Sequence, residues 1–180
     1  HTVFGTTSDG SPFFVPYDQL LIATGASPIR PVIEGVNLPG VFVVKNLDHG
    51  RQIKAWLTDH PARRAVIIGM GYIALEMAEA LTARGLQVDM IKPRPGLLPW
   101  LDTTLAQPLR ELLQAQGVGL YDGRPVERIF TVGNSLQVVS PPLALDCDLV
   151  VVAIGVTPNA WLAQEAGLPL GPGGAIAVDH

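Results

Sequence analysis

Two glycines and an alanine at fixed spacing are the residues of this chain with the clearest chemical potential. Gly69, Gly71 and Ala74 form the pattern G-x-G-x-x-A between an apolar run, Ala65–Ile68, and a stretch that predicts a helix, Tyr72–Arg84. In such a turn the first glycine permits a sharp bend and the second lets a pyrophosphate approach the backbone. The small third residue keeps the helix close to the strand. Because free N–H groups and the helix dipole favour anions at a helix start, the pattern predicts a dinucleotide site. The alternative is a glycine-rich turn that binds no nucleotide.

Two cations follow the next apolar run, Leu86–Ile91, which predicts a second strand. Lys92 and Arg94 stand where a dinucleotide site holds the adenine ribose. An acid there binds the 2′-hydroxyl of NAD, whereas a cation suits the 2′-phosphate of NADP. Asp89 has nearly the spacing of that acid but lies inside the strand, so we do not expect it to reach the ribose. The two cations therefore predict a preference for NADPH over NADH. The alternative is that both are solvated residues of a proline-rich loop.

Composition excludes several other classes of function. The chain has 180 residues, a formal charge of −4, and no run of apolar residues long enough to cross a membrane. An acidic surface repels phosphate backbones, so we expect no nucleic-acid partner. With no such apolar run and no recognisable signal peptide, we expect no membrane partner and a cytoplasmic location. The single cysteine, Cys147, lies between two aspartates, which disfavour a thiolate, and we expect it only to fill space. We expect no catalytic residue and no metal site, because the histidines (His1, His49, His60 and His180) show no metal-ligand spacing.

Alternating strand and helix patterns predict the elements that position these residues. We expect helices over 46–59, 72–84 and 102–116, and strands over 65–68, 86–91, 118–121 and 148–154. Asn46 and Asp102 are suited to cap the first and third helices. This alternation predicts an α/β fold with a Rossmann-like parallel sheet and right-handed crossovers. A small antiparallel hairpin is expected within the crossover over 125–140, turning at Gly133 and Asn134.

The two ends of the chain have a different pattern. We expect a hairpin from 1–5 and 12–15, an apolar strand over 19–24 and an extended connector over 27–40. At the other end we expect a short helix from Asn159 and an edge strand over 173–179. These β tails look like pieces of an adjoining domain, which suggests that the chain is an excised fragment. The chain then divides into residues 1–45, 46–158 and 159–180.

Three motifs occur in an order that resembles a known family. They are Tyr17–Gly25 (YDQLLIATG), Gly69–Glu76 (GMGYIALE) and Val151–Asn159 (VVAIGVTPN). Together they resemble the pyridine nucleotide–disulfide oxidoreductases, flavoproteins with two dinucleotide-binding domains. Within that family the chain is most similar to the coenzyme A-disulfide reductase and NADH oxidase branch. The resemblance implies that 1–45 and 159–180 belong to an FAD domain interrupted by an NAD(P) domain over 46–158.

The resemblance also implies roles for individual residues. Tyr72 would lie over the flavin and swing aside for nicotinamide, and Glu76 would help to hold the carboxamide end. The alternatives are an exposed aromatic at a helix start and an acid that complements the helix dipole. Gly155 would lie beside the nicotinamide, and the segment with Thr24 would touch the flavin. The expected cofactor-binding residues are Thr24, Gly25, Gly69, Gly71, Tyr72, Ile73, Ala74, Glu76, Lys92, Arg94 and Gly155.

These inferences predict one half of a redox enzyme. The parent enzyme would pass a hydride from NAD(P)H to FAD and then to a disulfide, thiol or oxygen acceptor. Its partners would be the remaining FAD domain and an interface domain, in a homodimer. FAD would be held only in the full-length parent, and the isolated chain would be inactive. The alternative from another class is a non-catalytic dinucleotide-binding or interaction module.

Overall fold

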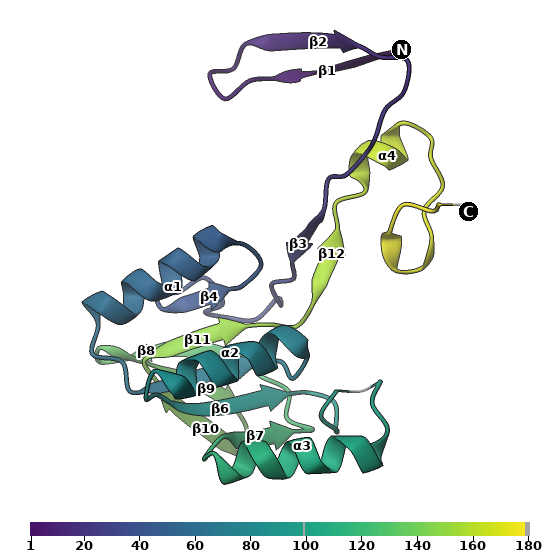
Figure 1. Ribbon diagram of the computed structural model, residues 1–180. Helices are drawn as coiled ribbons and strands as arrows, with labels where there is room; N and C mark the ends of the chain where they lie inside the picture. The colour runs from purple at the N-terminus through teal and green to yellow at the C-terminus, as the bar shows by residue number, and fades with distance from the viewer. Residues whose placement is uncertain (99, 179–180) are drawn as a thin grey trace. The chain divides into compact units, whose positions relative to one another are not determined.

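The chain folds into two compact units in a computed structural model that describes residues 1–98 and 100–178. The central unit comprises residues 27–157, and the second unit combines 1–26 with the segment that begins at 158 (Figure 1). The sequence placed the first boundary at residue 45. The structure instead assigns residues 27–45 to the central unit, because a strand within them joins its sheet.

A five-stranded sheet, parallel throughout, is the framework of the central unit (Figure 1). The strand order is β4-β11-β5-β6-β7. The bounds are Val41–Val43 for β4, Arg64–Ile68 for β5, Gln87–Lys92 for β6, Gly119–Asp122 for β7 and Leu149–Val152 for β11. Because the strands are parallel, their carboxyl ends share one edge, with β5 between β11 and β6. The expected α/β class and parallel sheet are thus confirmed.

Three helices begin close to their expected residues. They are α1 (Leu47–Asp59), α2 (Tyr72–Ala83) and α3 (Thr103–Ala115). The Asn46 side chain accepts a hydrogen bond from the His49 N–H, and the Asp102 carboxylate accepts one from the Thr104 N–H. These capping bonds satisfy N–H groups that have no partner within the helix. Both caps agree with the sequence prediction.

One face of the parallel sheet packs against helices, including α2. The other face packs against an antiparallel sheet of order β10-β9-β8. Its strands are β8 (Arg128–Val132), β9 (Ser135–Ser140) and β10 (Leu143–Cys147). Neighbouring residues of the central strands serve different cores: Ile67 and Val151 pack on the helix side, and Val66 and Val150 pack on this sheet. This two-sided burial explains the continuous apolar runs. The hairpin was predicted, but the third strand was not.

The second unit contains the expected hairpin of β1 (Thr2–Thr6) and β2 (Pro12–Pro16), together with the short helix α4 (Trp161–Glu165). The predicted strand over 19–24 is wrong, because those residues form no ladder. The predicted edge strand over 173–179 is also wrong within the described part. A 3-10 turn occupies Pro172–Gly174, and a single bridge joins Leu170 to Ile176. Positive φ angles at both glycines of this turn prevent an extended strand there; Asp179 lies outside the described residues.

A short two-stranded ribbon stands where the chain passes between the units. It consists of β3 (Ala26–Pro28) and β12 (Val156–Pro158). The sequence predicted an extended connector in the first of these segments. The second follows directly on β11, which ends at Val152 and not at Ile154 as expected.

Candidate dinucleotide site

The first glycine of the turn is required by its surroundings. Gly69 has a φ of 125°, and its N–H donates to the Ile91 carbonyl at 2.8 Å. A Cβ built on Gly69 would lie 2.1 Å from the carbonyl oxygen of Ala153. The backbone of the turn therefore passes so close to the residue after β11 that no side chain fits at position 69. This agrees with the sharp bend that the sequence predicted at this position.

The second glycine lies at the start of α2 in an extended conformation that any residue can adopt. Gly71 is the residue that precedes the helix, and its carbonyl accepts from the Leu75 N–H at 3.0 Å. Among the described residues, a Cβ here would come within 4 Å only of Trp100, at 3.8 Å. The missing side chain thus opens space over the helix start. Ala74, one turn on, is fully buried in the core beneath α2.

A cavity of about 450 Å³ opens at the carboxyl edge of the sheet, above this turn. In sheets of this kind, ligands bind outside the carboxyl ends of the strands. Every residue that lines the cavity belongs to the central unit. The lining includes seven of the residues expected from the sequence: Gly69, Gly71, Tyr72, Ile73, Lys92, Arg94 and Gly155. The remaining walls come from Val44, Met70, Pro93, Trp100, Val152, Ala153 and Ile154.

Trp100 is a wall of this cavity that the sequence reasoning missed. Its indole N–H donates to the Tyr72 hydroxyl at 3.0 Å, and the two ring centroids lie 5.1 Å apart. The two residues are 28 positions apart, so only the tertiary fold brings them together. The only sequence signal is a tryptophan in the loop that leaves the second strand of a dinucleotide motif.

The two predicted cations differ in their surroundings. Lys92 is 8% exposed, and its Nζ donates to the Gly96 carbonyl at 2.6 Å. Burial lowers the pKa of Lys92, although the carboxylate of Asp122 works in the opposite direction. Asp122 also accepts from the Gly96 N–H at 2.6 Å, so both side chains brace the same loop. Arg94 is exposed at the cavity rim. Of the two, Arg94 is therefore better placed to meet an incoming anion.

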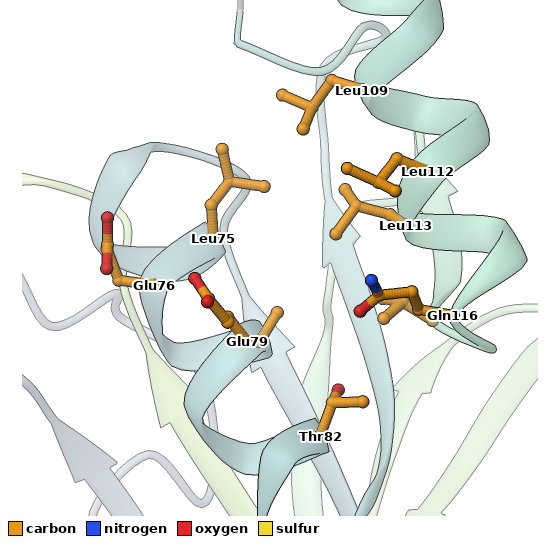
Figure 2. A pocket seen from close by; sticks show the side chains of 10 residues that line it. Leu75, Glu76, Glu79, Thr82, Leu109, Leu112, Leu113 and Gln116 are labelled. Carbon is orange, nitrogen blue, oxygen red and sulfur yellow. The ribbon is translucent and has the colours of Figure 1, made fainter.

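Glu76 lies outside the glycine cavity. It borders a second cavity, of about 250 Å³, between α2 and α3. Figure 2 shows Leu75 of α2 opposite Leu109 and Leu113 of α3, with Glu76 on the side of α2 farther from α3 in this view. The first turn of α2 holds no acidic residue, so Glu76 is also poorly placed to complement the helix dipole.

Two of the three sequence motifs meet in the second unit. The Thr24 hydroxyl donates to the Asn159 carbonyl at 2.5 Å, and the Asn159 side-chain amide donates to the Thr24 carbonyl at 2.9 Å. The Asn159 N–H in turn donates to the Gly25 carbonyl. The first motif is thus bonded to the end of the third, and neither Thr24 nor Gly25 is among the residues that line the glycine cavity.

Neither Cys147 nor Asp89 belongs to this cavity. Cys147 is 1% exposed, and burial, with a smaller contribution from the charge of Asp148, raises its thiol pKa to about 12. This confirms the expected packing role. Asp89 is half-buried on β6 beside Gly119, and burial raises its pKa. It lines neither of the cavities described above.

Two searches of the described residues gave negative results. Residues 1–98 and 100–178 contain no group of three or more histidines, cysteines or acids arranged to hold a metal ion. In the same residues, no helix is long and apolar enough to cross a membrane.

The motif, the sheet and the cavity fit one family, and comparison with known proteins identifies it. The model of the pyridine nucleotide-disulphide oxidoreductase family matches residues 1–180, and the chain belongs to this family of oxidoreductase enzymes. It is 37% identical over 164 residues to an NADH oxidase of Methanocaldococcus jannaschii. It is 35% identical over 169 residues to a CoA-dependent NAD(P)H sulfur oxidoreductase of Pyrococcus furiosus. These two similarities confirm the expected NADH oxidase and coenzyme A-disulfide reductase branch.

A solved structure supports the same placement. An NAD-dependent persulfide reductase from A. fulgidus superimposes with a TM-score of 0.90 at 36% identity, over 99% of this chain and 33% of its own. The matches cover 91% of this chain and 37% of the M. jannaschii protein, and 89% of this chain and 36% of the P. furiosus protein. The chain therefore spans about a third of the length of these three relatives.

Proposed function

We propose that the central unit binds NAD(P)H in the cavity at the carboxyl edge of the sheet. The observation that carries this proposal is the strand order. Gly155 follows β11, the glycine turn follows β5, and Lys92 and Arg94 lie at the end of β6 and just beyond it. Because β5 lies between the other two strands, the pyrophosphate would bind in the middle. The nicotinamide would then lie near Gly155, and the adenine ribose near Arg94.

The residues of the turn suit this group. The N–H groups at the start of α2 point out of the helix end, and an anion there gains hydrogen bonds and a favourable dipole. Gly71 leaves the approach open, and Tyr72 and Ile73 line the same cavity. When bound, a reduced nicotinamide supplies a hydride. This chain would hold and orient the nucleotide, while the apolar wall formed by Val152, Ala153 and Ile154 would limit water near its ring.

A preference for NADPH over NADH is the second part of the proposal. Its support is the exposed guanidinium of Arg94 at the cavity rim, which can grip a phosphate bidentately. Lys92 would add a nearby charge, but its ammonium group already bonds to Gly96. Because Arg94 is exposed and salt screens its charge, we expect roughly a tenfold preference.

The redox role of the parent is the third part. We propose that this chain is the nicotinamide half of a flavoprotein that passes a hydride from NAD(P)H to FAD and on to a disulfide, thiol or oxygen acceptor. Relatives named as an NADH oxidase and an NAD(P)H sulfur oxidoreductase support this role. FAD, an interface domain, dimerisation and a cytoplasmic location would belong to that parent. The bonded Thr24–Asn159 pair would form part of its FAD side.

Calorimetric titration of the chain with NADPH and with NADH tests the proposal. We expect saturable binding of both nucleotides at one site, with NADPH tighter. ATP is a suitable comparison ligand, because it carries the adenine and phosphates without the nicotinamide half. Binding of neither dinucleotide would contradict the proposal. Equal affinity for the two at low salt would contradict only the preference.

A further inference from the structure

The pair Tyr72 and Trp100 is unusual because each ring relies on the other. Tyr72 is 66% exposed and Trp100 is 56% exposed, so neither ring is held by burial in the core. They are joined by the hydrogen bond from the indole N–H to the phenol oxygen and by tilted ring contact, at 47° between the planes. One ring comes from the first residue of α2 and the other from the loop before α3. The bond therefore links two separate walls of the cavity.

The indole also lies beside Gly71, which a phosphate would approach in the proposed site. Its Cη2 atom lies 3.8 Å from the position where Gly71 would carry a Cβ. The edge of Trp100 therefore borders the space that the missing side chain provides, at ordinary van der Waals distance from a Cβ in that place. A phosphate group is larger than the single carbon that this space would hold, so a pyrophosphate that approaches Gly71 would meet the indole and push it aside.

Described residues of the loop on either side of Trp100 are anchored, so its ring can move while they stay in place. Gly96 is held by Lys92 and Asp122, and Leu98 is 4% exposed, with its carbonyl accepting from the Leu101 N–H at 2.8 Å. Rotation of one exposed side chain is a nanosecond event, whereas moving an anchored loop would disturb the core. The movable part of this wall is thus the Trp100 side chain.

We propose that Trp100 is a displaceable cover of the nucleotide cavity, held closed by the hydroxyl of Tyr72. This inference rests on the proposed function. A dinucleotide that reaches the start of α2 breaks the bond between the two residues, displaces the indole and releases Tyr72. Trp100 is therefore a positioning residue, which fixes Tyr72 when the cavity is empty. A closed state lowers the apparent affinity by the fraction of molecules that are open. We expect a factor of about two to ten, the effect of one neutral hydrogen bond of ordinary net strength.

Calorimetry with NADPH on matched variants measures this factor. Trp100→Ala removes the cover and is expected to bind about two- to tenfold more tightly than the natural chain. Trp161→Ala is the control, because Trp161 is similarly exposed, at 63%, but lies on α4 in the other unit. It should leave the affinity unchanged. If the natural chain binds NADPH and Trp100→Ala binds it with equal or lower affinity, the proposed role of Trp100 as a cover is refuted. The proposed function then stands. If neither chain binds, both proposals fail.

A double-mutant cycle separates the effect of the hydrogen bond between Trp100 and Tyr72 from a purely structural effect. Tyr72→Phe removes the acceptor and Trp100→Phe removes the donor, while both keep an aromatic ring. Each is expected to raise the NADPH affinity, and the double variant should add little to either single change, because one bond is lost in all three. Fully additive effects, or no effect of Tyr72→Phe, would show that the hydroxyl does not hold the cover closed.

Discussion

Gly69 and Ala153 approach each other so closely that a Cβ on the glycine would lie 2.1 Å from the alanine carbonyl oxygen. Gly69 also has a φ of 125°, where side chains are strained. We predict that Gly69→Ala lowers the free energy of unfolding by about 2–4 kcal/mol, from strain together with a backbone clash. Urea denaturation measures this change.

Gly117→Ala is the control for strain alone. Gly117 has a φ of 81°, but a Cβ there meets no atom of the described residues within 4 Å. It should cost about 1 kcal/mol. Equal losses in the two variants would show that the contact with Ala153 relaxes freely.

A second prediction concerns Asp148, whose carboxylate connects the start of β5 with the first residue of β9. Its carboxylate accepts from the N–H groups of Arg63 and Arg64, at 2.8 and 3.0 Å, and from the Ser135 hydroxyl at 3.0 Å. Burial raises the pKa of Asp148, but these hydrogen bonds outweigh it and leave the pKa below its usual value. We predict that Asp148→Ala costs about 1–2 kcal/mol at pH 7, since the group is partly exposed.

The pH dependence of that loss has a definite sign. A depressed pKa stabilises the fold above the unfolded value of about 3.9 and loses this effect as the pH falls through the folded value. The difference between the natural chain and Asp148→Ala should therefore shrink below about pH 4. Asp146→Ala is the control, because its carboxylate is exposed and accepts from only the Gln137 side chain among the hydrogen bonds of the described residues. A difference that grows in acid would contradict this assignment.

The third prediction is that the Cys147 thiol is unreactive toward disulfides in the folded chain. Because its pKa is raised to about 12 and its side chain is buried, almost no thiolate exists near pH 8. An aromatic disulfide reagent should react with it only after the chain is unfolded in urea. The same reagent mixed with NADPH and the folded chain should cause no NADPH oxidation. Rapid labelling of the folded chain, or steady NADPH turnover, would contradict this prediction.

The fourth prediction assigns the nucleotide preference to Arg94. Arg94→Ser should weaken NADPH binding about tenfold and leave NADH binding nearly unchanged, because only NADPH carries the 2′-phosphate. Lys92→Met is the contrasting variant. It removes the bond to Gly96 and should weaken the binding of both nucleotides, with a smaller loss of the NADPH preference than in Arg94→Ser. Dissociation constants at low and moderate salt test this, and an unchanged preference in Arg94→Ser would exclude the assignment.

Local signals predicted most of this fold from sequence. The caps at Asn46 and Asp102 and the glycine turn at Gly69 depend on residues close together in the chain, so their patterns are visible without tertiary structure. The run Leu149–Val152 was predicted as buried because both faces of its strand are covered. Its last predicted residues continue beyond the sheet edge and line the cavity instead.

Features set by distant contacts were not predictable. β10 is a short segment, LALDC, that was recognisable only through its pairing with β9. Sequence position suggested that Lys92 points to the nucleotide, but its bond to the Gly96 carbonyl depends on how the loop folds back. The contact between Tyr72 and Trp100 crosses 28 residues, and no local pattern indicates it.

The affinity of Gly71→Val for NADPH tests the central claim most directly. The backbone at Gly71 has a φ of −93°, which valine adopts without strain, and the nearest described atom to a new Cβ is 3.8 Å away. The variant should therefore fold with nearly unchanged stability, checked by urea denaturation. It should lose well over tenfold in affinity by calorimetry, because the branched side chain blocks phosphate contacts worth about 1.5–3 kcal/mol each. Unchanged NADPH affinity in a folded Gly71→Val chain would place the nucleotide elsewhere and contradict the account.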